Sequence, residues 1–371
     1  MAYKDPETFG IGSSGFNAIS VIIPAYQAEE TIERSVTSAL SIGPALREIV
    51  VLDDGATDDT SVIVARLANC DDRVRLIRQQ NKGRSAARNV GLAAAHGSWI
   101  MFLDADDYLF PGDYEVLIDA AVINDLGLII CQHSCSDAGK TEVRDTRTSL
   151  SDISVVSADS LKRVMVDGGW SGFVKDAERY EFNAAWSRLY RHDLISEAVN
   201  RLGTNFAPFP LGLRFSEDRL FNLEYLWLLE NGKVAFLPFC AYHWDVDRSA
   251  TCGVVRPQDV DSLVRYAAVV EVMRDRGLFG EREARLLLAR EFMGQFNRAT
   301  KSGSLLSEVQ EAWFRAFDAV WLREHLVECP RDSLGMHGEW RLAWELLSKG
   351  KLHAAFVIYG ALARVRVAIK H

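Results

Sequence analysis

Short apolar segments alternate with helix-like segments throughout the N-terminal part of the chain. The apolar segments span residues 19–23, 48–52, 74–78 and 99–103, and the helix-like ones span 29–40, 58–67 and 84–95. Short apolar runs rich in β-branched residues are typical of buried parallel strands. The resulting order βαβαβαβ predicts an α/β fold in which helices flank a mainly parallel sheet. Thr57, followed by two aspartates, is a candidate N-cap for the second helix.

Distinctive residues follow three of these predicted strands. They are Pro24-Ala25-Tyr26 after the first, Asp53-Asp54-Gly55 after the second and Asp104-Ala105-Asp106-Asp107 after the fourth. In open parallel sheets, ligands bind outside the carboxyl ends of the strands. The sequence therefore predicts one binding site built from these three turns.

The acidic turn after the fourth strand is the strongest chemical signal. Mg²⁺ and Mn²⁺ prefer hard oxygen ligands and usually keep positions open for phosphate oxygens. We therefore predict a Mn²⁺ or Mg²⁺ site for a nucleotide-diphosphate donor, with Asp106 as the main ligand and Asp104 assisting. Taken alone, an Asp-rich turn that simply ends a strand explains the cluster equally well. Contact between Asp104 and a ribose is a further alternative.

Four motifs in the same order resemble those of family 2 glycosyltransferases, which have the GT-A fold. They are Ile22-Ile23-Pro24-Ala25-Tyr26, Val51-Leu52-Asp53-Asp54-Gly55-Ala56-Thr57-Asp58, Asn81-Lys82-Gly83-Arg84-Ser85-Ala86-Ala87-Arg88-Asn89 and Asp104-Ala105-Asp106-Asp107. The resemblance continues more thinly to about residue 255. It implies a GT-A fold with a mixed, mainly parallel sheet and a nucleotide-sugar donor. It also implies an acceptor of the bacterial envelope, capsule or teichoic-acid type.

The resemblance assigns donor contacts to the first two motifs. Pro24, Ala25 and Tyr26 border the nucleobase, and Asp54 accepts the hydrogen bond of the uracil N3–H group, for which a carboxylate is a suitable acceptor. Asp53 is expected to support the turn. Ala56 stands where the family usually has Ser, so no hydroxyl is available at that position.

Basic residues of the third motif lie near the start of the helix predicted over residues 84–95. Free backbone N–H groups at a helix N-terminus also attract anions. The resemblance implies contact with the diphosphate or the donor sugar, for which we favour Arg84. Arg88 is alternatively structural, and basic residues on a helix are most often a solvated face or ion-pair partners.

A second acidic pair, Glu217 and Asp218, lies within Phe215-Ser216-Glu217-Asp218-Arg219-Leu220-Phe221, which resembles the family's Glu-Asp motif. It follows another family-like segment at residues 186–191. The resemblance makes Asp218 the general base that takes the proton of an acceptor hydroxyl as its oxygen attacks the anomeric carbon, with inversion. Ser216 followed by two acidic residues is also typical of a helix N-terminus, and both interpretations can hold together.

The segment Tyr242-His243-Trp244-Asp245, with Arg248-Ser249 after it, resembles the end of the family's catalytic domain. The resemblance implies that His243 binds the metal or the leaving diphosphate and that Ser249 bonds a phosphate oxygen. A single His between aromatic residues is more often packed and hydrogen-bonded. His243 also lacks a partner ligand at metal-site spacing.

Composition narrows the class of protein. The chain has 371 residues and a net charge of −9, which argues against a nucleic-acid-binding protein. Its six cysteines form no CxxC pair or zinc spacing, so we expect reduced thiols in a cytoplasmic enzyme. We expect neither a signal peptide nor a transmembrane span, because no apolar run is long enough.

We predict three parts along the chain: a loose tail over 1–16, a GT-A catalytic domain over 17–255 and a helical region over 256–371. The catalytic domain divides into a nucleotide-binding half, 17–110, and an acceptor half, 111–255. Helices are expected at 259–276, 281–300, 305–321 and 339–348, with apolar spacing that suits a small bundle.

The last segment, 349–371, contains five Lys or Arg residues and no acidic residue. A basic amphipathic helix of this kind favours peripheral contact with the inner face of the plasma membrane. A terminal helix docked on the bundle is an equally good explanation.

The sequence thus predicts a metal-dependent, inverting glycosyltransferase. It would move a hexosyl or N-acetylhexosaminyl group, from a UDP-sugar, to a hydroxyl of a cell-surface glycan, teichoic acid or glycolipid. One alternative is a nucleotidyltransferase. A Gly- and Lys/Arg-rich loop after the first strand would favour that interpretation, but this chain has Pro24-Ala25-Tyr26 there. The other is a non-catalytic nucleotide-sugar-binding subunit, which the presence of Asp104, Asp106 and Asp218 disfavours. The sugar, the acceptor and the oligomeric state stay open.

Overall fold

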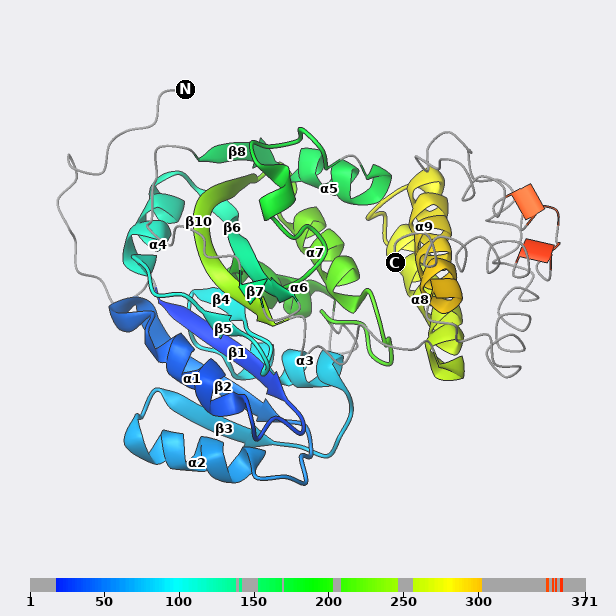
Figure 1. Cartoon of the computed structure of the whole chain (residues 1–371). Helices are drawn as coiled ribbons and strands as arrows, with labels where there is room; N and C mark the ends of the chain where they lie inside the picture. The colour runs from blue at the N-terminus through cyan, green and yellow to red at the C-terminus, as the bar shows by residue number, and fades with distance from the viewer. Residues whose placement is uncertain are drawn as a thin grey trace. The chain divides into compact units, whose positions relative to one another are not determined.

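The computed structural model describes residues 18–137, 140–141, 153–168, 170–202, 208–245 and 256–301, with 345–346, 349, 351 and 354–355. The chain divides into two compact units (Figure 1). Unit 1 comprises Met1–Leu161, Trp170–Leu211 and Tyr225–Ser249, and unit 2 comprises Lys162–Gly169, Gly212–Glu224 and Ala250–His371.

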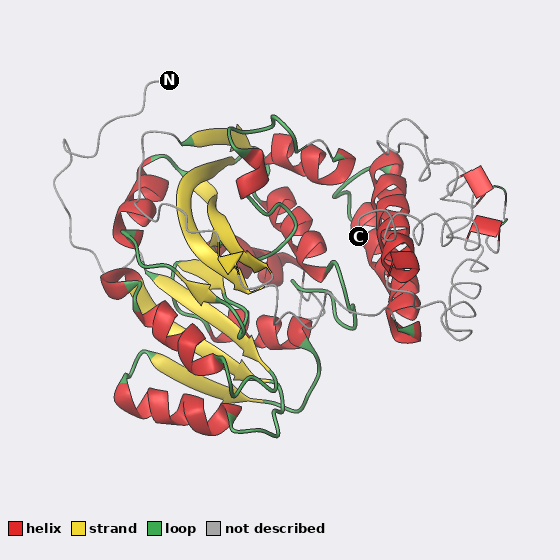
Figure 2. Cartoon of the chain, viewed as in Figure 1, coloured by secondary structure: helices red, strands yellow, loops and turns green. Residues whose placement is uncertain are grey.

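Unit 1 is built on one curved sheet (Figure 2). The strands are β1 (Ile19–Ala25), β2 (Leu46–Asp53), β3 (Val74–Arg78), β4 (Trp99–Phe102), β5 (Tyr108–Leu109), β6 (Leu126–Asp137), β7 (Lys140–Thr141), β8 (Ser154–Ser157), β9 (Arg188–Arg191) and β10 (Lys233–Asp245). Their main order in the sheet is β3-β2-β1-β4-β9-β6-β10-β5. Neighbours among the first four are parallel, and β10 is parallel to β6. Strand β9 runs antiparallel between β4 and β6. The predicted mixed, mainly parallel sheet is confirmed.

Helices cover both faces of the nucleotide-side strands. The helices of the two units together are α1 (Ile32–Leu40), α2 (Thr60–Cys70), α3 (Arg84–Ala94), α4 (Tyr114–Ile123), α5 (Ala158–Asp167), α6 (His192–Leu202), α7 (Glu217–Leu228), α8 (Pro257–Asp275) and α9 (Glu281–Lys301), with short 3-10 turns at Gly43–Ala45 and Ala177–Arg179. Val36 of α1 joins the core that includes Val21 and Ile23 of β1. Gly91 of α3 faces the alternate residue Ile22, and a Cβ there would lie 2.4 Å from Ile22 Cγ2. Side chains alternate along a strand, so α1 and α3 pack on opposite faces.

The predicted strands and helices of the N-terminal part are confirmed, with one local error. Thr57 does not cap α2, because the helix begins at Thr60 and Asp59 takes the N-cap position. The Asp58 carboxylate accepts the Thr60 N–H at 3.1 Å, and Thr57 N donates to Gln27 Oε1 at 2.7 Å. The Asp58 carboxylate, which lies nearer the start of α2, thus accepts a hydrogen bond from the first turn in place of the expected Thr57 hydroxyl.

In unit 2, two short segments from the middle of the chain, 162–169 and 212–224, group with the C-terminal part. The helices expected at 259–276 and 281–300 are confirmed as α8 and α9. Those expected at 305–321 and 339–348 lie outside the described residues except for 345–346, as do the tail 1–16 and most of 349–371. The predicted domain boundaries at residues 16, 110 and 255 stay a prediction.

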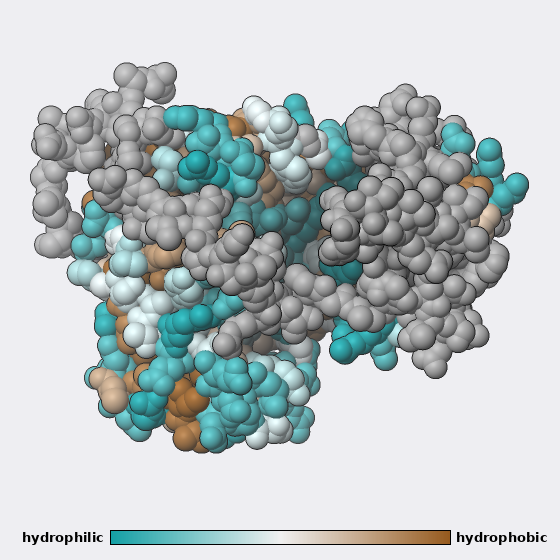
Figure 3. Space-filling model, in the orientation of Figure 1, coloured by the Kyte–Doolittle hydropathy of each residue, from teal (hydrophilic) through white to brown (hydrophobic). Residues whose placement is uncertain are grey.

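Apolar side chains that reach the surface are spread over several elements. Examples are Val62 on α2, 65% exposed, and Val122 on α4, 50% exposed. On the face drawn in Figure 3, hydrophilic surface predominates over the described residues. No helix among the described residues combines the length and the apolar run needed to cross a membrane.

Candidate functional site

The three predicted turns meet at the carboxyl edge of the sheet in unit 1. Ala25, the last residue of β1, pairs with Asp53 of β2, and the Asp54 N–H donates to the Ala25 carbonyl at 2.9 Å. On the other side of β1, the Leu103 N–H donates to the Ile22 carbonyl at 3.0 Å. The strand order therefore gathers residues that are up to eighty positions apart along one edge.

The first turn presents a ring at this edge. Pro24 and Ala25 end β1, and Ala25 is buried. Tyr26 follows with 53% of its surface exposed. An exposed ring next to buried backbone is a suitable surface for a nucleobase to stack on.

The second turn depends on the buried Asp53. Its carboxylate accepts the Ala56 N–H at 2.7 Å and Arg78 Nε at 3.1 Å, and it also bonds the Ser61 hydroxyl. Gly55 has φ +77°, and a Cβ there would lie 2.8 Å from Asn81 N. Asp53 thus supports the turn as expected, and the turn uses the backbone of Ala56, so the substitution of Ser by Ala leaves this bond in place.

Asp54 connects the second turn to the loop before α3. Its Oδ1 accepts Gln79 Nε2 at 2.7 Å and Lys82 N at 2.9 Å, and its Oδ2 accepts Gly83 N at 2.8 Å. A carboxylate offers about four acceptor positions. Three of them are used here, which leaves about one for a nucleobase N–H group.

The acidic turn is held in shape by Asp107. This buried carboxylate accepts the Tyr242 hydroxyl at 2.5 Å and the Asp245 N–H at 2.8 Å. The Tyr242 oxygen in turn accepts the Asp104 N–H at 3.3 Å. Ser35 of α1 approaches the Ala105 carbonyl at 2.8 Å. Asp107 is therefore structural, whereas Asp104 and Asp106 are more exposed.

The carboxylates of the turn repel one another. Burial, with the charges of Asp104 and Asp245, raises the pKa of Asp106 to about 6. Burial, with the charges of Asp104 and Asp106, raises the pKa of Asp107 to about 8. Negative charge concentrated in a partly buried turn favours the binding of a cation.

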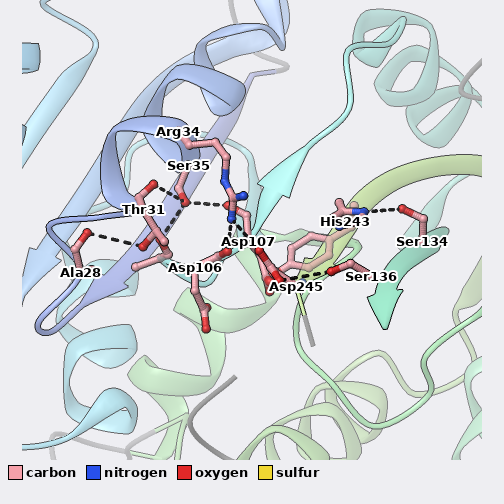
Figure 4. A network of polar contacts seen from close by, with 12 residues as sticks. Ala28, Thr31, Arg34, Ser35, Asp106, Asp107, Ser134, Ser136, His243 and Asp245 are labelled. Atoms are coloured by element: carbon pink, nitrogen blue, oxygen red, sulfur yellow. Dashed lines mark hydrogen bonds and ion pairs between the residues drawn. The ribbon is translucent and has the colours of Figure 1, made fainter. Parts of the chain in front are cut away.

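Arg34 of α1 is a cation that lies on this turn (Figure 4). It donates to the Asp106 carbonyl and pairs with Asp245 Oδ2 at 3.3 Å. Its guanidinium lies 5.1 Å from the centre of the Tyr108 ring, which stacks on His243 at 4.4 Å. No sequence motif marks Arg34, because it faces the turn only after the helix packs.

His243 lies inside this aromatic stack. It is buried, and its Nδ1 is 2.8 Å from Ser134 Oγ, so Nε2 is the nitrogen left for any ligand. Burial lowers the pKa of His243 and favours the neutral ring. Within the described ranges, no group of three or more His, Cys, Asp or Glu side chains is placed to hold a metal ion. Any metal at Asp104 and Asp106 would need further ligands from a bound phosphate or water.

Two arginines of the third motif, Arg84 and Arg88, differ in burial. Arg88 is buried, and its Nη2 donates to Asp104 at 2.8 Å. Its guanidinium also lies 5.2 Å from the centre of the Phe209 ring. Phe209 is held by two 2.8 Å hydrogen bonds between its backbone and the Asn89 side chain. Arg84, by contrast, is the half-buried first residue of α3.

The second acidic pair begins α7 in unit 2, as predicted. Glu217 is 1% exposed, whereas Asp218 is partly exposed. Burial therefore favours Asp218 as the carboxylate that meets a substrate. Ser249, the predicted phosphate contact, lies outside the described residues.

Comparison with known proteins identifies relatives of the N-terminal part. Residues 20–189 match the family model described as Glycosyl transferase family 2. The chain is similar to the uncharacterized glycosyltransferase EpsJ of Bacillus subtilis, with 32% identity over 56% of this chain and 55% of EpsJ. It is also similar to the succinoglycan biosynthesis protein ExoU of Rhizobium meliloti, with 31% identity over 51% of this chain and 54% of ExoU. The match thus spans about half the length of these relatives.

Solved structures share the fold. The S. aureus TarS 1–349 structure in complex with UDP-GlcNAc aligns with a TM-score of 0.62 and 19% identity, covering 94% of this chain and 92% of that one. The complex with UDP aligns with a TM-score of 0.60 and 17% identity, covering 94% and 91%. The curved, mainly parallel sheet with flanking helices is the GT-A fold. Residues 20–189 of this chain are therefore similar to glycosyltransferase family 2 domains.

Proposed function

We propose that this chain is a glycosyltransferase that moves a sugar from a nucleotide-sugar donor to an acceptor hydroxyl. The main support for this proposal is the acidic turn. Asp104 and Asp106 lie there at the carboxyl edge of a GT-A sheet, beside the turns after β1 and β2. Such an edge is where open α/β sheets bind nucleotides. Tyr26 would border the base, and Asp54 would use its remaining acceptor position on the base N–H group.

A divalent cation suits this turn. Asp104 and Asp106 offer hard oxygen ligands, and burial together with the neighbouring Asp104 charge raises the pKa of Asp106. Bound Mn²⁺ or Mg²⁺ would neutralise the charge that develops on the leaving diphosphate. Asp107 and Tyr242 hold the turn, Arg88 orients Asp104, and Arg84 offers positive charge at the start of α3 for the phosphates. His243 is a less suitable ligand, since Ser134 already engages one of its nitrogens.

Asp218 is the proposed general base. A sugar hydroxyl is far too weak an acid to lose its proton beforehand, so proton transfer to Asp218 accompanies the attack of the oxygen on the anomeric carbon. Attack from the side opposite the leaving diphosphate inverts the anomeric centre. No covalent sugar–protein intermediate forms in this scheme.

The substrate class follows from the relatives' printed names. The TarS structures contain UDP or UDP-GlcNAc, and ExoU is named for succinoglycan biosynthesis. We therefore propose a UDP-sugar donor, carrying a hexosyl or N-acetylhexosaminyl group, and a hydroxyl acceptor on a cell-surface glycan, teichoic acid or glycolipid.

The first experiment measures binding of UDP, GDP and CDP by calorimetry, each with and without Mn²⁺, followed by a transfer assay with sugars on the nucleotide that binds. Tight binding of UDP only with Mn²⁺, followed by release of UDP in the assay, is the expected result. Equal binding with and without Mn²⁺ would contradict the metal site, and binding of none of the three would contradict the donor site. Retention of the donor's anomeric configuration in the product would contradict the role of Asp218.

A further inference from the structure

Ser216, the residue before the Glu217–Asp218 pair, has an unusual backbone conformation. Its φ is +56°, in the left-handed region that residues other than glycine rarely adopt. Its carbonyl accepts the Leu220 N–H at 3.2 Å, so the first turn of α7 starts from this residue. The direction of the partly exposed Asp218 side chain therefore depends on how Ser216 is held.

A buried carboxylate of α9 holds Ser216. The Ser216 hydroxyl donates to Glu291 Oε2 at 2.6 Å, and Gln295 Nε2 donates to Glu291 Oε1 at 2.8 Å. Glu291 is only 6% exposed and Gln295 only 5%. A buried carboxylate is costly unless hydrogen bonds satisfy it, and here both oxygens receive one. This arrangement is a built contact between the C-terminal helices and the candidate base segment.

The rest of the segment is tied to the same unit on both sides of Ser216. Arg214 N donates to Ser262 Oγ of α8 at 3.1 Å, and Arg214 Nε pairs with Asp259 Oδ1 at 2.5 Å. After the acidic pair, Arg219 Nη2 donates to the Met165 carbonyl at 2.6 Å. Ser216 is thus the central one of three anchors around Asp218.

We propose that Glu291 is a positioning residue for Asp218, acting through the Ser216 hydroxyl. By accepting that hydrogen bond, Glu291 keeps Ser216 in its left-handed conformation and fixes the start of α7. The C-terminal helices would then be part of the catalytic machinery. This inference rests on the proposed role of Asp218 as the general base.

The test compares Glu291→Leu with Glu283→Leu, the same substitution two turns earlier at a partly exposed position of α9. In Glu291→Leu we expect kcat to fall about 100-fold, since small misplacement of a catalytic group costs this much. The dissociation constant for the donor, from calorimetry, should stay within about twofold of wild type. The control variant should keep wild-type kcat.

Two further variants separate positioning from general loss of stability. Glu291→Gln should recover most of kcat, because its amide oxygen still accepts the Ser216 proton and Gln295 can turn its own amide to accept the new N–H. Ser216→Gly keeps the left-handed backbone at no steric cost but removes the hydrogen bond. Its kcat should fall less than that of Glu291→Leu, and the Glu291→Leu/Ser216→Gly double variant should be no worse than Glu291→Leu alone.

Amide hydrogen exchange of residues 216–221 supplies a measurement that does not depend on activity. Faster exchange in Glu291→Leu, but not in Glu283→Leu, is expected. Wild-type kcat or unchanged exchange in Glu291→Leu would overturn the inference. The wild-type protein could fail to transfer sugar while Glu291→Leu, but not Glu283→Leu, still exchanges faster. That result would contradict the proposed function but would still support the hydrogen bond between Glu291 and Ser216.

Discussion

The acidic turn of unit 1 and the Glu217–Asp218 pair of unit 2 both place a buried carboxylate beside a more exposed one. In the turn, Asp107 accepts two hydrogen bonds and holds the backbone. In unit 2, Glu217 is buried and Asp218 is partly exposed. Neighbouring carboxylates thus differ in burial, and on that ground we propose different roles for them.

The two regions differ in how they are held. The acidic turn follows a strand, and the contacts that shape it come from the same sheet and from α1. The start of α7 is held by α8 and α9, from residues up to seventy-five positions away. We therefore expect changes in the turn to affect metal and donor binding, and changes around α7 to affect the chemical step.

The largest expected effect is that of Asp218→Asn. Loss of a general base typically costs about 10²- to 10⁴-fold in rate. We expect kcat for transfer to fall in this range while calorimetric binding of the donor stays unchanged. Normal kcat in Asp218→Asn would show that unit 2 supplies no general base. It would favour a non-catalytic or different role for the Glu217–Asp218 pair.

Asp106→Asn is expected to affect ligand binding at the acidic turn of unit 1. Removing one carboxylate from the turn should weaken Mn²⁺-dependent binding of UDP by about 100-fold or more. Asp72→Asn, an exposed aspartate next to β3, is the matched control and should bind UDP normally. Equal binding by both variants would show that the turn holds no metal.

Arg88→Met tests whether the basic residues of the third motif divide into structural and ligand-binding roles. The variant loses the buried guanidinium that bonds Asp104. Because Asp104 is itself 32% exposed, we expect a loss of about 1–3 kcal/mol in the free energy of unfolding, measured with urea. Arg84→Met should instead weaken donor binding with little change in stability, and the reverse pattern would exchange the two roles.

A further prediction concerns Glu224 in unit 2 and the pH dependence of stability. Burial raises its pKa to about 8, although Arg276 lies 3.5 Å away. The folded state therefore binds a proton that the unfolded chain releases near the ordinary glutamate value. The stabilisation of the folded state by protonated Glu224 is fully present below about pH 4.5. It decreases as the pH rises towards about 8.

Glu224→Gln should remove this dependence. The wild-type free energy of unfolding should change by at most about 1.4 kcal/mol per pH unit from this group between pH 5 and 8, and the variant should be flatter. Identical urea midpoints across this range for the two proteins would show that Glu224 is ionised in the folded state.

Much of the donor side was predictable from the sequence because its residues follow strands directly. The four strands β1 to β4 and the positions of the acidic turn, Asp53 and the start of α7 agree with the predictions from the sequence. The Thr57 cap was wrong because Asp58 offered a closer acceptor for the first N–H groups of α2. Arg34 and Phe209 were not predicted, since their partners lie far away in sequence.

By itself, the sequence determined the order of strands and helices up to about residue 103 and the residue types at the carboxyl edge, because strand periodicity and turn chemistry are local properties. Only the tertiary structure decided which carboxylates are buried, which arginine meets which aspartate, and that Glu291 bonds Ser216. Those outcomes depend on the packing of distant segments, which sets both the burial that shifts a pKa and the donors that satisfy a buried charge.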